Sequence, residues 1–192
     1  MHAHFQLQPP VSELPKLADQ FCKEAGDREQ HLETAAFEAG SAIRNGETTL
    51  ANLEAIVRWK SERAVHYLIG NSTASIRRAL EVAAAPEASA EEAISALLVL
   101  HGVDLPIASA ILTAIFPERY TVMDCQILEA LGYPRQDIQF YEDFLAFCNH
   151  MVAAGAVPEQ GTEADMPLRR LDRALRQWSE NQTERQMEAA GV

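Results

Sequence analysis

The sequence predicts an all-α fold, and three observations support this prediction. Apolar residues recur three and four positions apart and so fall on one side of a helix, for example Leu168, Leu171 and Leu175. Ser89 and Glu92 match a capping box, which is a local signature of a helix start. Val, Ile and Thr do not alternate with polar residues over the length of a strand, so no sheet is expected.

The chain is expected to consist of a short arm and one domain. Residues 1–11 contain Pro9 and Pro10 and show little periodicity, which predicts an irregular N-terminal arm. Residues 12–192 are expected to form a single helical domain. A chain of 192 residues, 47% of them hydrophobic, can bury a core without disulfides or metals.

Four helices are expected in the first half of this domain, each between a start signal and a stop signal. The residues that start them are Ser12, Asp27, Thr48 or Thr49, and Thr73. The first helix runs to about residue 25, and the stop signals of the others are Asn45-Gly46, Gly70-Asn71 and Pro86. A bend is expected within the third helix, at about residues 58–63.

Five more helices are expected after Pro86. The capping box at Ser89 begins the first of them. The expected ranges are 90–100, 105–116, 124–131, 138–154 and 167–187.

The charge balance restricts the choice of partners. The net charge of −12 and the pI near 4.9 count against a general DNA-binding protein, because Lys and Arg that neutralise phosphates supply most of the strength of nucleic-acid binding. Positive charge is nevertheless concentrated in residues 41–80, which contain Arg44, Arg58, Lys60, Arg63, Arg77 and Arg78. These residues form either a local basic face or scattered charges in contact with solvent.

Cysteine usage and the N-terminus point to a cytoplasmic protein without cofactors. Cys22, Cys125 and Cys148 are odd in number and have no metal-ligand spacing, so we expect reduced thiols and neither a disulfide framework nor a metal site. The first residues lack the basic and apolar regions of a signal peptide, and no apolar run is long enough to span a bilayer.

A tight turn between two apolar helices, at about residues 90–116, carries the strongest functional signal. Gly102, Val103 and Asp104 form this turn and His101 precedes it. The first amides of the following helix have no partner within the helix, and the helix dipole adds partial positive charge there. Such a hairpin can bind a DNA phosphate through its backbone, so these four residues are the candidate DNA contacts.

This segment resembles the helix-hairpin-helix (HhH-GPD) superfamily of base-excision DNA glycosylases. Asp124 lies 22 positions after Gly102, which is the spacing of the first hairpin glycine and the catalytic aspartate in that family. The matching residues are Leu97, Leu100, Gly102, Val103, Ala108, Val122, Asp124 and Ile127. The resemblance implies a compact two-lobed helical domain and a role for Asp124 in stabilising the oxocarbenium-like sugar as a damaged base leaves.

Two departures from the family pattern affect what the resemblance implies. Pro106 stands where the lyase-competent members have a lysine, so no Schiff-base chemistry and no strand nicking are expected. A monofunctional glycosylase, which uses water instead of a lysine, is compatible with this change. Asp104 replaces the second hairpin glycine and is expected to cap the helix that begins at Leu105, which weakens the phosphate contact. Asp124 itself is also interpretable as a helix cap alone.

Two functions therefore stay open at this stage. One is a base-excision enzyme acting through Asp124. The other is a non-catalytic helical module that uses the same scaffold to bind a protein partner, a nucleotide or an unusual nucleic acid, which the acidic charge and Asp104 favour.

Three further groups of residues are candidates for a site. Trp59 and Lys60 are candidate pocket residues, although packing of a partly buried tryptophan on an amphipathic helix is the plainer explanation of Trp59. Lys60 is also a candidate amine nucleophile, but the sequence does not place it near Asp124. The last group is a basic cluster on the final helix, which consists of Arg169, Arg170, Arg173 and Arg176. Ion pairs with Asp172, Glu163 and Asp165 on a solvated face explain this cluster at least as well as phosphate binding does.

Overall fold

In the computed structural model, which describes residues 5–132, 138–157 and 166–191, all regular structure is helical. The all-α prediction is therefore confirmed for this part of the chain. None of the helices in the described ranges has the length and apolar character needed to cross a membrane. The helices are α1 (Leu14–Glu24), α2 (Asp27–Arg44), α3 (Leu50–Lys60), α4 (Thr73–Ala83), α5 (Ala90–Leu98), α6 (Leu105–Ile115), α7 (Cys125–Ala130), α8 (Ile138–Ala153) and α9 (Pro167–Ala190), with 3₁₀ helices η1 (Val11–Glu13) and η2 (Glu62–Gly70).

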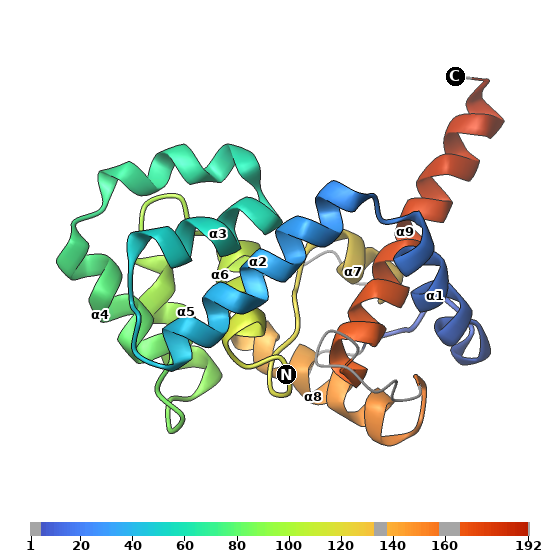
Figure 1. The fold of residues 1–192 in the computed structure, drawn as a ribbon. Helices are drawn as coiled ribbons and strands as arrows, with labels where there is room; N and C mark the ends of the chain where they lie inside the picture. The colour runs from blue at the N-terminus through green and yellow to red at the C-terminus, as the bar shows by residue number, and fades with distance from the viewer. Residues whose placement is uncertain (1–4, 133–137, 158–165, 192) are drawn as a thin grey trace.

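The helices form two groups that share one hydrophobic core (Figure 1). In one group α2 packs on α3 and α6, and α4 packs on α5. In the other group α1, α7 and α8 pack around α9. The C-terminal part of α9 extends away from the rest of the molecule (Figure 1).

Several helix starts follow the expected capping chemistry. Thr49 accepts a hydrogen bond from the Asn52 amide, so Thr49 rather than Thr48 caps α3. Ser89 and Glu92 form both bonds of the capping box at the start of α5. The prediction for Ser12 is wrong: this residue lies inside the 3₁₀ turn η1, and α1 begins after Glu13 with no side-chain cap.

The third predicted helix is broken at its expected bend. Ser61 adopts an extended backbone conformation, and the chain continues as the 3₁₀ helix η2 rather than as an α-helix. Lys60 is thus the last residue of α3 and lies next to the break.

The expected N-terminal arm is packed against the domain where it is described. The amides of Gln6 and Gln8 donate to the carbonyls of Leu131 and Ala130, at 3.0 and 2.8 Å. The ring of Phe5 lies against the rings of Phe140, Phe144 and Phe147 on α8. The arm is therefore irregular in backbone but part of the core, through backbone pairing with the end of α7 and aromatic packing on α8.

The closest approach of α2 to α6 depends on Gly40. This glycine is buried in α2, and a Cβ atom built there would overlap the backbone carbonyl of Ala114 in α6. The absence of a side chain at position 40 therefore sets how closely the two helices pack.

We predict that Gly40→Ala destabilises the protein by at least about 3 kcal/mol, since the neighbour that must move is backbone rather than a flexible side chain. Thermal or denaturant unfolding measures this change. Gly26→Ala is the control, because nothing lies within 4 Å of a Cβ at that position, and its cost should not exceed about 1 kcal/mol. Equal stability of the two variants would show that the α2–α6 contact has room for a methyl group.

Candidate functional site

Asp124 is a buried carboxylate at the start of α7. One oxygen, Oδ1, accepts a hydrogen bond of 3.0 Å from the Ile127 amide, so Asp124 is the N-cap of the helix. The residue is 6% exposed. The capping role considered from the sequence is therefore present, and it occupies one of the two carboxylate oxygens.

The second oxygen of Asp124 is held by Lys60. The Lys60 ammonium Nζ donates to Asp124 Oδ2 in an ion pair whose side chains are 16% and 8% exposed. The two residues are 64 positions apart, and no sequence pattern predicts their contact. The structure thus brings together the candidate catalytic aspartate and a candidate amine that sequence reasoning had left apart.

Hydrogen bonds from neighbouring elements fix the segment that carries Asp124. The Ser109 hydroxyl, on α6, accepts from the Met123 amide at 3.0 Å and donates to the Pro106 carbonyl at 2.9 Å. The Tyr141 hydroxyl, on α8, donates to the Thr121 carbonyl at 3.0 Å. Ser109 therefore links the position of Asp124 to the helix that follows the α5–α6 turn, a role that no local sequence signal indicated.

A pocket of about 480 Å³ lies between η2 and the α5–α6 turn, residues 99–104. Lys60 belongs to its wall and also contacts Asp124, so it stands between the pocket and the buried carboxylate. The pocket is lined by Lys60, Ser61, Arg63, Ala64, Tyr67, Gly102, Val103, Asp104, Pro106 and Ile107. Two cations and the predicted turn residues thus face the same space.

The α5–α6 turn is clamped to η2. Gly102 has φ of +86°, and a Cβ there would lie 2.8 Å from the Tyr67 Cβ, so both the conformation and the space favour glycine. The Asn71 side chain accepts from the His101 amide at 2.8 Å and donates to the His101 carbonyl at 2.9 Å. His101 is exposed and Val103 is buried.

Asp104 caps α6 as the sequence predicted. Its Oδ1 accepts a 3.0 Å hydrogen bond from the Ile107 amide, and Pro106 in the first turn has no amide hydrogen. The Asp104 carboxylate therefore occupies one of the backbone amides with which the start of α6 would bind a phosphate. It also places a negative charge beside the remaining amides.

Three large apolar side chains are exposed on η2 and on the α5–α6 turn. Tyr67 is 58% exposed, Ile69 is 78% exposed and Val99 is 77% exposed. Tyr67 and Ile69 belong to η2, and Val99 belongs to the α5–α6 turn, so the two elements joined by Asn71 carry the exposed apolar groups. Of these three residues, Tyr67 also lines the pocket.

Trp59 does not line this pocket, although it adjoins Lys60 in sequence. Its ring packs 5.6 Å from the Phe37 ring, and the Arg169 guanidinium lies 5.1 Å from its centre. The half-buried tryptophan thus joins α3 to α2 and α9.

The basic cluster of α9 is buried rather than solvated, so the predicted solvated face is wrong. Arg169, Arg170 and Arg173 are 2–7% exposed. Glu33 of α2 accepts from Arg169 at 3.0 Å and from Arg173 at 2.7 Å. Asp19 of α1 pairs with Arg170 at 2.9 Å, and Asp172 pairs with Arg169. Glu163 and Asp165, the other expected partners, lie outside the described residues.

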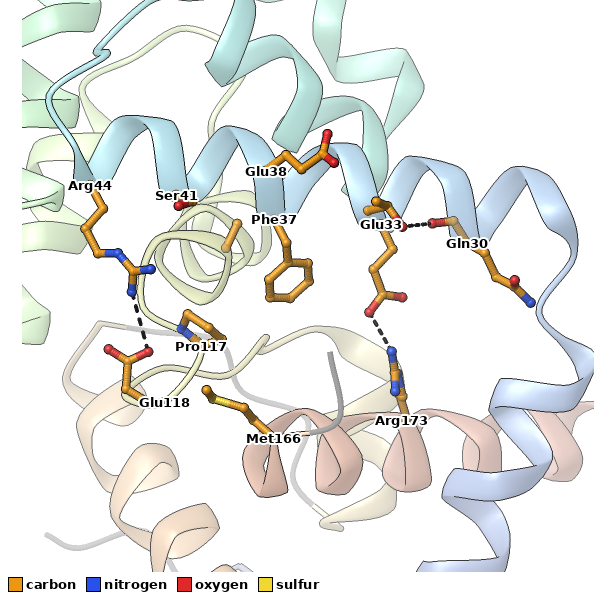
Figure 2. A pocket seen from close by; sticks show the side chains of 12 residues that line it. Gln30, Glu33, Phe37, Glu38, Ser41, Arg44, Pro117, Glu118, Met166 and Arg173 are labelled. Atoms are coloured by element: carbon orange, nitrogen blue, oxygen red, sulfur yellow. Dashed lines mark hydrogen bonds and ion pairs between the residues drawn. The ribbon is translucent and has the colours of Figure 1, made fainter. Parts of the chain in front are cut away.

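A second cavity of about 600 Å³ adjoins this network between α2 and the start of α9. Figure 2 shows Phe37 pointing from α2 toward Pro117 and Met166, with Glu33 and Arg173 on one side. At the other side Arg44 and Glu118 lie 3.9 Å apart. Two carboxylates of its wall, Glu33 and Glu118, are thus paired with arginines of the same wall, Arg173 and Arg44.

Burial and neighbouring charges move the pKa values of three carboxylates in different directions. Burial raises the pKa of Asp124, but the charge and hydrogen bond of Lys60 outweigh this and hold it below its usual value. Burial raises the pKa of Asp172, and Arg169 offsets this only in part. Burial also acts on Glu33, yet Arg169 and Arg173 lower its pKa to about 2. Asp124 and Glu33 are therefore ionised at neutral pH.

No metal-binding group is found in the described ranges: no three His, Cys, Asp or Glu side chains gather as ligands there. Cys22 and Cys125 are exposed thiols and Cys148 is a buried one.

No family model, curated protein or solved structure matches the chain. The resemblance to the HhH-GPD glycosylases rests on the residues themselves and stays a prediction.

We predict that Glu33→Gln lowers stability at pH 7 by on the order of 3 kcal/mol, because it removes the buried carboxylate that binds both Arg169 and Arg173. Since the folded pKa of Glu33 is about 2, below its ordinary 4.5, its contribution is complete above pH 4.5 and is lost as the pH falls toward 2. Unfolding curves between pH 7 and 2 should therefore converge for wild type and variant. Glu38→Gln, an exposed neighbour on α2, serves as the control, and a gap that does not change with pH would refute the assignment.

Proposed function

We propose that this chain is a DNA glycosylase of the helix-hairpin-helix type, which removes a modified or damaged base through Asp124. The observation that carries the proposal is the buried ion pair of Asp124 with Lys60 at the wall of the pocket beside the α5–α6 turn. This pair joins the aspartate that the sequence resemblance singles out to a pocket formed by the predicted turn residues.

The environment of Asp124 suits the stabilisation of a positive charge. Cleavage of a glycosidic bond leaves the sugar with oxocarbenium character, and a carboxylate in a poorly solvated site stabilises such charge strongly. The lowered pKa keeps Asp124 ionised at neutral pH. In the free protein the Asp124 carboxylate forms an ion pair with the Lys60 ammonium. The same carboxylate would attract the positive charge of the sugar.

Contacts with DNA would come from the rim of the pocket. Lys60 and Arg63 provide positive charge there, despite the overall charge of −12. The exposed side chains of Tyr67, Ile69 and Val99 offer apolar surface to bases that are exposed when a nucleotide is flipped. A local cationic and apolar surface of this kind favours distorted DNA over regular duplex.

The decisive prediction concerns Asp124→Asn. Asparagine keeps the cap on the Ile127 amide, but it removes the negative charge and leaves the Lys60 ammonium without its carboxylate, so thermal unfolding must show that the variant is folded under the assay conditions. We expect base release from a panel of duplexes with modified bases to fall roughly 100-fold or more. Asp27→Asn, on the exposed first turn of α2, should release base at the wild-type rate. Absence of base release by wild type from every duplex tried would contradict the proposal.

A non-catalytic binding module is the second candidate, and a specific observation favours it. Both oxygens of Asp124 have protein partners, and the Asp104 carboxylate occupies the start of α6. These contacts are sufficient to explain both residues as structural. Base release by wild type that is lost in Asp124→Asn would rule this candidate out.

Binding to DNA tests whether the α5–α6 turn contacts DNA. We expect Asp104→Asn, which keeps the cap but loses the charge, to bind a duplex with an abasic-site analogue several-fold more tightly at low salt. The gain should shrink at moderate salt, because screening weakens charge repulsion. Titration of a labelled duplex at two salt concentrations measures both effects. Identical affinities for wild type and variant would place the DNA away from the α5–α6 turn.

A further inference from the structure

The cavity of about 600 Å³ between α2 and the start of α9, named the α2–α9 cavity below, is a second space in the structure that can hold a ligand. It shares no lining residue with the pocket that contains Lys60. Its volume lies within the range of small-molecule sites in proteins. The function proposed above makes no use of it.

One face of α2 forms the upper wall of the α2–α9 cavity. Phe37, Ser41 and Arg44 are four and three positions apart, so their side chains lie on the same side of the helix. Seven residues of helix place Phe37 and Arg44 roughly 10 Å apart along the axis. The helix thus offers an aromatic ring, a hydroxyl group and a cation in one row.

The middle of the cavity is apolar. The ring of Phe37 is half-buried and points toward Pro117 and Met166 (Figure 2). It also packs 5.6 Å from the ring of Trp59, which supports its position. An apolar group of a ligand would gain free energy by leaving water for this space, and an aromatic group would gain most.

One end of the cavity carries a loose ion pair. Arg44 and Glu118 lie 3.9 Å apart, which is longer than a hydrogen bond, and their side chains are 38% and 52% exposed. Such an exposed pair contributes little to stability, so little is lost when a ligand comes between the two groups. This end therefore presents one cation and one anion side by side.

The charges at the other end are committed to the fold. Glu33 accepts from Arg173 at 2.7 Å and from Arg169 at 3.0 Å, in the buried network that joins α2 to α9. Separating these buried partners would cost far more than opening an exposed pair. The charged groups of a ligand are therefore expected at the end with Arg44 and Glu118.

We propose that the α2–α9 cavity binds a free α-amino acid with a large apolar side chain. The carboxylate of the amino acid pairs with Arg44, and its ammonium group pairs with Glu118. The apolar side chain packs against Phe37, Pro117 and Met166. This inference does not depend on the glycosylase activity proposed above.

The charge of the wall favours a zwitterion over a simple ion. A ligand with a carboxylate alone would bring a second negative charge beside Glu118, and a ligand with an ammonium alone would bring a second positive charge beside Arg44. A zwitterion replaces one loose ion pair with two charge-assisted hydrogen-bonded pairs. It also leaves the net charge of this end unchanged.

The test is isothermal titration calorimetry of the full chain with L-phenylalanine, L-tryptophan and L-leucine. We expect saturable binding of at least one of them, with one molecule bound per chain. Three analogues of phenylalanine each remove one recognised group: phenylpropanoate lacks the ammonium, phenylethylamine lacks the carboxylate, and L-alanine lacks the ring. Each should bind at least about 10-fold more weakly than L-phenylalanine, because hydrogen bonds to charged groups and burial of a ring contribute at least that much.

Variants assign each charged group of the ligand to its partner. Arg44→Gln should weaken L-phenylalanine at least about 10-fold but should not weaken phenylethylamine, which has no carboxylate to lose. Glu118→Gln should weaken L-phenylalanine in the same way without weakening phenylpropanoate. Arg77→Gln on α4 and Glu184→Gln on α9 are exposed controls and should bind as wild type does. Thermal unfolding checks that every variant is folded.

The proposal can fail in three ways. Absence of saturable binding for all three amino acids overturns it. Equal affinity of wild type for L-phenylalanine and for one of the two single-charge analogues also overturns it, since the site would then recognise an apolar acid or amine. Binding that is unchanged in both Arg44→Gln and Glu118→Gln places the ligand elsewhere. None of these results depends on base release, so the proposed function is tested separately.

Discussion

Ion pairs buried between the two groups of helices are the interactions on which this structure depends. Lys60 of α3 holds Asp124 at the start of α7, and Glu33 of α2 holds two arginines of α9. Removing one partner of such a pair leaves an uncompensated charge in a poorly solvated interior, which costs several kcal/mol. The same contacts therefore fix the relative position of the two groups, and one of them joins Asp124 to the wall of the pocket between η2 and the α5–α6 turn.

Local chemistry was predictable from the sequence, whereas contacts between distant elements were not. A helix cap joins residues three positions apart, so Ser89, Asp104 and Asp124 could be interpreted directly. The contact of Lys60 with Asp124 spans 64 positions, and that of Arg169 with Glu33 spans 136. Without related sequences, charge spacing along one helix cannot reveal a partner on another, and for this reason the cluster on α9 was interpreted as solvated.

The buried pairs also change the meaning of the net charge. Three of the four α9 arginines that were candidates for phosphate binding are instead paired with Glu33, Asp19 and Asp172. The DNA binding that we propose would then depend on the cations beside the pocket, Lys60 and Arg63, in an acidic chain. Such a distribution favours recognition of a locally opened or distorted strand over sliding along regular duplex, because long-range attraction is weak.

A site is defined by where its groups meet in space, and this allows a functional group to be supplied by a different element. In this chain proline occupies position 106 and an aspartate caps the helix beside it, so the turn keeps its shape but carries no amine. The break at Ser61 ends α3 where its last side chain can enter the same pocket and contact Asp124. A search of the sequence for a lysine at position 106 therefore finds no amine, whereas the structure places the Lys60 amine against the Asp124 carboxylate.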